Sequence, residues 1–358
     1  MGATFGRNLR MTIFGESHGK GIGLVLDGLP PGTPIDEEFI KEEMARRAPG
    51  QNRMSTQRQE KDAYIIESGV FEGRAAGTPL CVLIPNSDQH SGDYSLLKDV
   101  MRPGHADYAG KIRYKGFNDY RGGGHFSGRL TAPLVFTGAV AKTVLAQKGI
   151  AVVAHVARIG TVTDSLFDPL GEPEECLQAL RKQTLPVLDT SKAPLMESEI
   201  LSAREHQDSV GGIIEVMATG IPAGIGDPFF DSLESRLAHA LFSVPAVKGI
   251  EFGAGFAMAA LKGSEANDPM IFERDKVRTT CNNNGGITGG ITNGMPVLFR
   301  VAVKPTPSIS QPQQTVNVTE GKNTVLEIKG RHDTCIVPRA VPVMEAVTAW
   351  VLLDMLLG

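Results

Sequence analysis

Short apolar runs separated by glycine-rich turns dominate the first half of the chain. Runs of roughly 4–8 apolar and β-branched residues bounded by glycine or proline are typical of strands. On this basis we expect strands at residues 9–14, 22–26, 64–71 and 79–84. A helix is expected between the second and third strands, because Asp36 suits its N-cap and Glu37 and Glu38 suit its first turn. This helix should end near Arg46 and Arg47, ahead of a Pro-Gly pair.

The second half repeats this style after a long apolar segment. Residues 129–147 are apolar at most positions and lead to Gly149, so they predict a buried helix. Beyond them, we expect strands at residues 211–218 and 296–303 and helices at residues 231–242 and 341–357. Residues 160–195 are polar and contain several prolines and acidic residues, which predicts a surface excursion.

Two G-x-P-x-G turns, at residues 28–32 and 220–224, each separate an expected strand from an expected helix. Their shared context indicates an internal duplication of a βα unit. The alternative is that a common turn type occurs twice by coincidence.

Composition limits the class of protein. With 358 residues and 41% hydrophobic content, the chain can bury a sizeable core, as one large domain or two intimate ones. The net charge of −4 excludes the broad basic face of a nucleic-acid-binding protein. An aromatic content of 6% is too low for a base-stacking platform. Any anion binding must therefore come from local clusters of Arg and Lys.

Cysteine spacing and the apolar segments indicate a cytoplasmic protein without a metal site or a membrane partner. Cys81, Cys176, Cys281 and Cys335 form no C-x-x-C pair, and no His follows at zinc-finger spacing, so reduced thiols are expected. The N-terminal residues do not match a signal peptide. Residues 346–357 are too short to span a membrane and contain an Asp, so they should form a buried helix.

Residues 15–19 read Gly-Glu-Ser-His-Gly, which matches the G-x-S-x-G pattern of serine hydrolases. That pattern requires a helix after the serine, whereas a strand is expected here. The segment also fails the P-loop pattern, because Gly21 stands where Ser or Thr is required. What remains is a Ser17–His18 pair on a glycine-flanked turn, where both side chains can face a cleft.

Three further turns combine glycine with histidine or arginine. Residues 102–107 place His105 in a polar turn, and histidine can transfer a proton near neutral pH. Residues 119–129 contain three consecutive glycines ahead of a helix start, which suits a phosphate or carboxylate. Residues 330–333 read Gly-Arg-His-Asp and could bind an anion and move a proton, or form a solvated turn.

Arginines gather beside these turns. Those noted are Arg46, Arg47, Arg53, Arg58, Arg102, Arg121, Arg129 and Arg331. Arginine is permanently charged and grips carboxylate or phosphate through two N–H groups. Their placement in an acidic chain indicates a small, highly anionic ligand, although each arginine taken alone could be an ordinary surface residue. Residues 281–294 are dense in Gly and Asn, which suits a loop that lets the backbone approach a ligand or another chain, or a floppy surface loop.

Taken together, these segments resemble the chorismate synthase family. The matching stretches are FGESHG (14–19), DGLPPGTP (27–34), RRAPGQNR (46–53), SGVFEG (68–73), DYSLLKDVMRPGHADY (93–108), DYRGGGHFSGR (119–129), VPAVKGIEFG (244–253), NGGITGGITNG (284–294), VKPTPSI (303–309) and KGRHDTC (329–335). They follow one another in order along almost the whole chain, so the resemblance covers residues 1–358 as a single domain.

The resemblance implies a fold and a reaction. The implied fold is α+β, a β-α-β sandwich with helices between two antiparallel sheets and an internal pseudo-two-fold. The implied reaction is the anti-1,4-elimination of phosphate from 5-enolpyruvylshikimate 3-phosphate to give chorismate, in the shikimate pathway. It requires reduced FMN without net redox change. A homotetramer and an external flavin reductase or reductant are implied, because the chain lacks an extension that could house its own reductase.

The resemblance also implies roles for individual residues. His18 would act as acid toward the leaving phosphate, His105 would stabilise the reduced flavin, and Asp333, relayed through Ser17, would take a flavin proton. The residues implied to bind substrate anions, the cofactor phosphate or a nucleotide such as NADP are Arg47, Arg53, Arg102, Arg129 and Arg331. The residues implied to hold FMN are His125, Phe126, Ser127, Pro245, Ala246, Gly289, Lys304, Pro305, Thr306, Pro307, Ser308 and Arg331.

The chain departs from the family pattern on the flavin side. Many members have Arg-Ser-Ser where this chain has His125-Phe126-Ser127, and Asn-Ala where it has Pro245-Ala246. Contacts through those side chains are in question, while backbone contacts could persist. Two other classes stay open: a serine hydrolase built on Ser17 and His18, and a non-catalytic protein that holds a phosphorylated metabolite.

Overall fold

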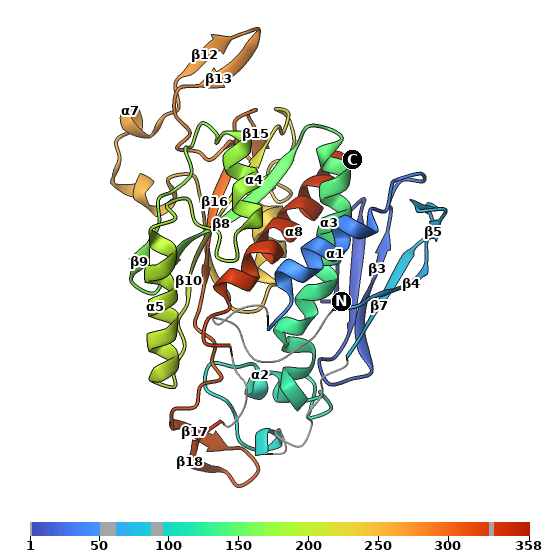
Figure 1. The fold of residues 1–358 in the computed structure, drawn as a ribbon, viewed down its shortest axis with the longest axis vertical. Coiled ribbons are helices and arrows are strands. Elements are labelled where there is room, and N and C mark those ends of the chain that lie inside the picture. The colour runs from blue at the N-terminus through green and yellow to red at the C-terminus, as the bar shows by residue number, and fades with distance from the viewer. Residues whose placement is uncertain (1, 51–61, 87–95, 329–332) are drawn as a thin grey trace.

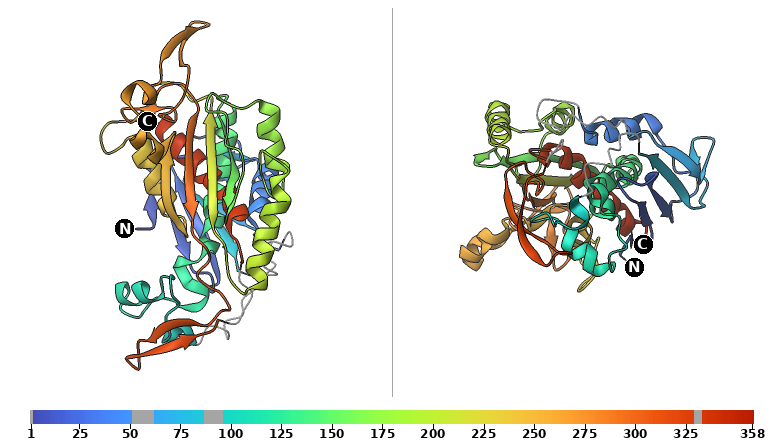
Figure 2. Two further views of the ribbon diagram at one scale, coloured as in Figure 1. Left: turned by 90° about the vertical axis from the view of Figure 1, so that its left-hand side faces the viewer. Right: turned by 90° about the horizontal axis from the view of Figure 1, so that it is seen from below.

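Two five-stranded antiparallel sheets enclose a layer of helices (Figure 1). The computed structural model describes residues 2–50, 62–86, 96–328 and 333–358. Strand order is β1-β2-β3-β7-β4 in the first sheet and β11-β16-β10-β8-β9 in the second. Figure 2 shows the two sheets on either side of the central helices. The predicted α+β sandwich with helices between two antiparallel sheets is confirmed.

The bounds of the elements are as follows. The first sheet contains β1 (Thr4–Phe5), β2 (Arg10–Gly15), β3 (Gly21–Asp27), β4 (Ile65–Ser68) and β7 (Leu80–Pro85). The second contains β8 (Ala151–Ile159), β9 (Val162–Thr163), β10 (Gly212–Thr219), β11 (Val247–Phe252) and β16 (Val297–Val303). Paired two-stranded hairpins are β5 (Val70–Phe71) with β6 (Arg74–Ala75), β12 (Met270–Glu273) with β13 (Lys276–Thr279), β14 (Ile287–Thr288) with β15 (Ile291–Thr292), and β17 (Gln313–Asn317) with β18 (Lys322–Leu326).

The α-helices are α1 (Glu37–Arg47), α2 (Asp107–Arg113), α3 (Thr131–Ala146), α4 (Glu174–Lys182), α5 (Lys192–Glu205), α6 (Leu233–Phe242), α7 (Gly263–Ala266) and α8 (Val337–Leu356). Short 3₁₀ helices are η2 (Arg121–Phe126), η3 (Gly128–Leu130) and η4 (Gly255–Ala260). Asp36 caps α1 as expected, since its carboxylate accepts a hydrogen bond of 3.0 Å from the backbone N–H of Phe39.

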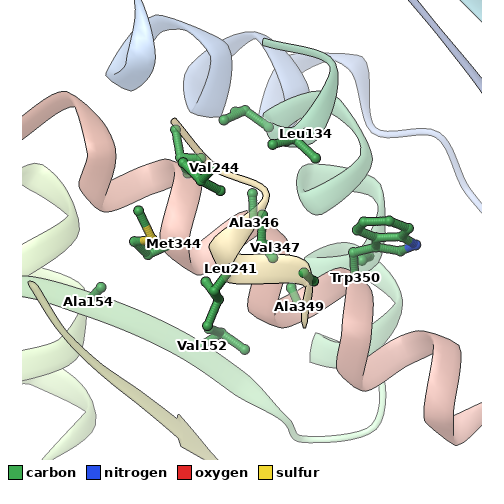
Figure 3. Packing of buried hydrophobic residues seen from close by; sticks show 14 of the residues in the cluster. Leu134, Val152, Ala154, Leu241, Val244, Met344, Ala346, Val347, Ala349 and Trp350 are labelled. Carbon is green, nitrogen blue, oxygen red and sulfur yellow. The ribbon is translucent and has the colours of Figure 1, made fainter. Parts of the chain in front are cut away.

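Helices α3 and α8 form the centre of the core. α3 packs on β3, α8 packs on β8 and β10, and the two helices pack on each other. A β-carbon built on Gly138 of α3 would lie 2.2 Å from the Cα of Ala346 in α8, so this close approach requires glycine. Figure 3 shows Ala346 and Val347 of α8 packed between Leu134 of α3 and Val152 of β8.

The two halves of the chain share one order of elements, which gives the predicted pseudo-two-fold. The first half runs β2, β3, α1, β4, β7, α3, and the second runs β8, β10, α6, β11, β16, α8. Gly28 and Gly220 open the two G-x-P-x-G turns with φ values of 94° and 77°. In each case an added β-carbon would collide with a backbone carbonyl, of Asn8 or of Gly149, just ahead of the first strand of that half. A duplication as the origin of this symmetry stays a prediction.

Some expected elements differ from those observed. The strand expected at residues 64–71 is divided into β4 and β5, because Gly69 turns the chain with a φ of 87°. The last helix begins at Val337, earlier than expected, since Pro338 is tolerated in a first turn. Pro342 lies inside that helix, so proline did not mark its boundary.

The segment expected as a surface excursion contains α4 and the start of α5, which cover the outer face of the second sheet. Leu177 and Leu180 of α4 join a small core with Val153 and Met217 of the sheet. The second sheet is therefore buried on both faces. Among the described residues, no helix is long and apolar enough to cross a membrane.

Candidate active site

The turn between β2 and β3 carries Ser17 and His18, and both are buried. The Ser17 hydroxyl donates to the carbonyl of Gly122 at 3.0 Å and lies 3.2 Å from His18 Nδ1. Because the hydroxyl proton is directed to a carbonyl, the shared hydrogen bond has Nδ1–H as its donor. Ser17 therefore fixes the orientation of the His18 ring.

Three consecutive glycines bring two histidines to one turn. Gly122, Gly123 and Gly124 have φ values of 57°, 86° and 53°, a backbone that other residues rarely adopt. A β-carbon on Gly122 would lie 2.1 Å from His18 Nδ1, and one on Gly123 would lie 3.2 Å from the His105 ring. The predicted phosphate-binding turn is thus the wall shared by both candidate acid–base histidines.

His105 is held by charged neighbours. Its Nδ1 lies 2.7 Å from the Asp107 carboxylate, and Arg102 donates to both oxygens of that carboxylate at 2.7 Å. Burial opposes the charge on Asp107, but hydrogen bonds from Arg102 and His105 hold its pKa well below its usual range. The ionised carboxylate keeps the His105 proton on Nδ1, and the ring carbon Cε1 and Nε2 lie toward the glycine turn.

The predicted flavin segments at residues 245–246 and 304–308 lie next to the turn that carries His105. Lys304 donates through Nζ to the carbonyl of Gly104 and through its backbone N–H to the carbonyl of Ala246 at 2.9 Å. Ser308 lies 3.3 Å from a guanidinium nitrogen of Arg102. Burial and the neighbouring Lys248 lower the pKa of Lys304. Sequence reasoning missed Lys248, which adds a second cation here.

Arg47 and Arg129 share one buried carboxylate. Asp62 accepts from Arg47 Nε at 2.9 Å, and Arg129 Nη1 binds its other oxygen. Burial favours the neutral acid, but the two guanidinium groups hold the pKa of Asp62 below its usual range. Two cations against one carboxylate leave a surplus positive charge. Sequence reasoning missed Asp62, because no local motif marks it.

Asn86 joins this cluster to the histidine turn. Its side-chain oxygen accepts from Arg129 Nε at 3.1 Å, and its amide nitrogen donates to the carbonyls of Glu16 and Gly19 at 2.9 and 3.0 Å. Arg129 is therefore coupled to the turn that holds His18. Asn86 was also missed, since nothing in its local sequence distinguishes it.

Asp333 lies beside the arginine cluster. Arg339 donates to Asp333 at 2.5 Å and to the carbonyl of Arg47 at 3.0 Å. The hydrogen bonds of the Ser17 hydroxyl given above involve His18 and Gly122, and none joins Ser17 to Asp333. The relay from Asp333 through Ser17 stays a prediction, and Arg339 is a further residue that sequence reasoning missed.

The side chains of three residues predicted to hold the cofactor contact other parts of the protein. His125 Nδ1 lies 3.0 Å from the carbonyl of Gly15, and Phe126 packs against Tyr114, just after α2, with ring centroids 6.1 Å apart. The Ser127 hydroxyl accepts from the backbone N–H of Arg129 at 3.3 Å. Any flavin contact here is expected through the backbone.

Within one chain, Gly289 lies apart from the other residues predicted to hold FMN. It links β14 to β15, at the opposite end of the molecule from α2, which follows His105 (Figure 1). Its role in cofactor binding stays a prediction. Arg53 and Arg331 lie outside the described residues. The described residues contain no group of three or more His, Cys, Asp or Glu side chains that could hold a metal ion.

The chain is similar to known proteins along its whole length. Residues 9–357 match the family model described as chorismate synthase. A chorismate synthase of Methanocella arvoryzae is 49% identical over 100% of this chain and 95% of its own length. One of Thermococcus gammatolerans is 50% identical over 98% of this chain and 97% of its own length. A solved structure titled "Crystal Structure of Chorismate Synthase" superimposes with a TM-score of 0.77 and 32% identity, over 99% of this chain and 93% of that one.

Proposed function

Because the chain belongs to the chorismate synthase family, we propose that it converts 5-enolpyruvylshikimate 3-phosphate to chorismate and inorganic phosphate. The reaction is an anti-1,4-elimination that requires reduced FMN without net redox change. The observation that supports the proposal is the glycine turn against which both His18 and His105 lie, with Arg102 bound to the Asp107 carboxylate beside His105. A compact site of this kind suits acid–base chemistry on a small anion.

The charge of the site fits the substrate, which carries two carboxylates and a phosphate. Arg47, Arg129 and Arg339 face two carboxylates, Asp62 and Asp333, so the cluster holds a surplus cation. Arginine pairs bind such oxyanions through two parallel N–H groups. In the proposal Arg53 and Arg331 complete the set, and Arg102 adds charge on the His105 side.

His18 is proposed to give a proton to the leaving phosphate. Its ring is buried, and the hydrogen bond between Nδ1 and the Ser17 hydroxyl fixes the ring plane. Ser17 is a positioning residue in this account, because its own proton is directed to a backbone carbonyl. Asp333 is proposed to take the flavin proton, and Arg339 holds its carboxylate in place.

The residues around His105 fit a flavin mononucleotide. Lys304 and Lys248 together offer positive charge for a phosphate, and Ala246 has a φ of 75° that bends the backbone toward Lys304. The ring of His105 would face the electron-rich edge of the reduced flavin. When bound, reduced FMN supplies transient electron density as phosphate leaves. The protein residues named here bind the cofactor, orient it and hold a proton at His105 Nδ1.

We infer a cytoplasmic homotetramer of single-domain subunits, each built from a duplicated unit, with an external flavin reductase or reductant. The free cysteines are compatible with a reducing compartment.

An anaerobic assay tests the function. The full-length protein is mixed with dithionite-reduced FMN and the enolpyruvyl substrate, and chorismate absorbance and phosphate release are followed together. We expect equal amounts of both products, and none with oxidised FMN alone. Well-folded protein that forms no chorismate would overturn the proposal.

The hydrolase alternative finds no support in the geometry of Ser17. A nucleophilic serine needs an exposed hydroxyl that gives its proton to a histidine. Here the hydroxyl is buried and donates to the carbonyl of Gly122. In addition, β3 follows the turn, where a hydrolase has a helix. Activity of the Ser17→Ala variant toward activated esters distinguishes the two classes.

A further inference from the structure

A small cavity lies beside the residues proposed for catalysis and cofactor binding, and Arg339, which binds Asp333, belongs to its lining. Its volume is about 180 Å³, and it is bounded by the end of α4, the loop that follows, and the first turns of α8. Its cationic lining residues are Arg46, Arg181, Lys182 and Arg339. Among the described residues, no Asp or Glu lines it. A cavity lined by four cations and no acid offers a site for an anion.

The acids that balance these cations lie beneath the cavity. Glu43 accepts from Arg46 and Arg181, each at 2.9 Å, and from Lys142 at 2.5 Å. Glu345 accepts from Arg46 at 2.7 Å and from Lys142 at 2.5 Å. Both carboxylates are buried and bind the arginines from the protein interior. The remaining parts of the guanidinium groups therefore line the cavity. These two acids face three cations, which leaves one positive charge in surplus.

Lys182 raises the surplus, and Arg339, which is paired with Asp333, adds a buried guanidinium group to the lining. Lys182 is exposed and has no ion pair with any residue that the structure describes. Burial lowers the pKa of Arg339. The Asp333 carboxylate raises this pKa and offsets part of the effect, whereas the neighbouring Arg47 lowers it further. A buried guanidinium with incomplete compensation is stabilised by an added anion. Arg339 also donates to the carbonyl of Arg47 and to Asp333, so it links the cavity to the proposed active site.

We propose that this cavity binds a compact multivalent oxyanion of the phosphate or phosphomonoester class. Arginine forks match the oxygens of such groups, and Lys182 adds a point charge at the rim. The volume is below the roughly 300–1,000 Å³ of pockets for drug-sized ligands, so a whole nucleotide does not fit. Pro186 and Pro342 form an apolar wall that keeps the site small. The proposal does not depend on the reaction that the protein catalyses.

Calorimetric titration with inorganic phosphate tests the site, on the full chain at low ionic strength and without flavin or substrate. Lys182→Glu reverses a charge at the rim and should weaken phosphate binding by about tenfold, as expected for the loss of a close charge pair. Lys276→Glu makes the same charge change in the distant β12–β13 hairpin (Figure 1) and should alter the affinity less than about twofold.

A second variant removes space and keeps the charge. Thr184 is exposed on the cavity lining, so Thr184→Phe fills the entrance without disturbing the core, and it should abolish the same binding event. Unchanged melting temperatures would show that both variants fold. Equal phosphate affinity in wild type, Lys182→Glu and Thr184→Phe would overturn the proposal. So would a signal lost in Arg102→Gln but retained in Lys182→Glu, because phosphate would then bind at the proposed active site.

Discussion

His18 and His105 lie against the same glycine turn, but their partners differ in charge. His18 is held by the Ser17 hydroxyl, and His105 is held by the ionised Asp107 carboxylate with Arg102 beside it. A hydroxyl orients a ring without adding charge, whereas a carboxylate suits a ring that must face an electron-rich group. The comparison teaches that two histidines on one turn can have different roles when their partners differ in charge. In the proposed mechanism, His18 acts on the leaving phosphate and His105 on the reduced flavin.

The largest effect is expected for His18→Ala. Loss of a positioned proton donor should lower kcat by about 10³-fold, within the usual range for general acids. The affinity for reduced FMN should stay within about twofold, because His105 and its partners are intact. Stopped-flow measurement of chorismate formation, with flavin binding measured in parallel, checks both. A variant with wild-type kcat would remove His18 from the chemistry.

Asp333→Asn should have the next largest effect, about 10²-fold in kcat, because the amide cannot accept the proton. Arg339 can still donate to the amide oxygen, so the local structure should persist. FMN binding should therefore be unchanged, as measured by flavin fluorescence. If the variant fails to bind FMN, Asp333 has a structural role instead.

Ser17→Ala should lower kcat by only about tenfold, because we propose that the hydroxyl acts by positioning His18. The His18 ring loses a partner at 3.2 Å, but its contact with Gly122 remains. Ser17→Thr keeps the hydroxyl and serves as the matched control, with kcat nearer to that of wild type. A loss as large as that of His18→Ala would make Ser17 a direct participant.

His155 extends the comparison to a histidine away from the glycine turn, with the smallest expected effect on rate. It is buried between Asp164, at 3.2 Å, and Glu215, at 2.9 Å. Burial favours the neutral ring, but the two carboxylates raise its pKa above the usual value. Its contribution to stability is therefore complete below the unfolded pKa of about 6.5 and is lost as pH rises through the folded pKa.

His155→Gln should leave kcat unchanged and lower the free energy of unfolding by about 3–5 kcal/mol at pH 6, because two buried carboxylates lose their cation. The difference from wild type should shrink as the pH is raised. Urea unfolding of both proteins from pH 6 to pH 9 checks this. A constant difference across that range would show that the pKa of His155 is the same in the folded and unfolded protein.

The local parts of this account could be predicted from the sequence. The cap of α1 at Asp36, the paired G-x-P-x-G turns and the glycine run at residues 122–124 are read from neighbouring residues. Each depends on a backbone conformation or a cap that a few adjacent residues determine. The placement of Ser17 and His18 on a hairpin turn follows in the same way.

The partners of the site residues could not be predicted. Asp62 and Arg129 are 67 positions apart in the chain, and no periodic pattern joins them. Lys248 carries no motif either, and it matters only because the fold brings it to Lys304. Arg339 is close to Asp333 in the chain, but its other partner, the carbonyl of Arg47, is 292 positions away. Charge balance in a buried site is set by tertiary contacts, which the local sequence does not encode.

The proposal that the two histidines have different roles is tested most directly by flavin affinity. The affinities for reduced and oxidised FMN are measured anaerobically in wild type, His105→Gln and His18→Gln. We predict that wild type and His18→Gln bind reduced FMN more tightly than oxidised FMN. His105→Gln should lose at least about tenfold of that preference, together with about 10²-fold in kcat, since its Asp107-held ring is gone. Loss of the preference in His18→Gln, with the preference intact in His105→Gln, would contradict the account.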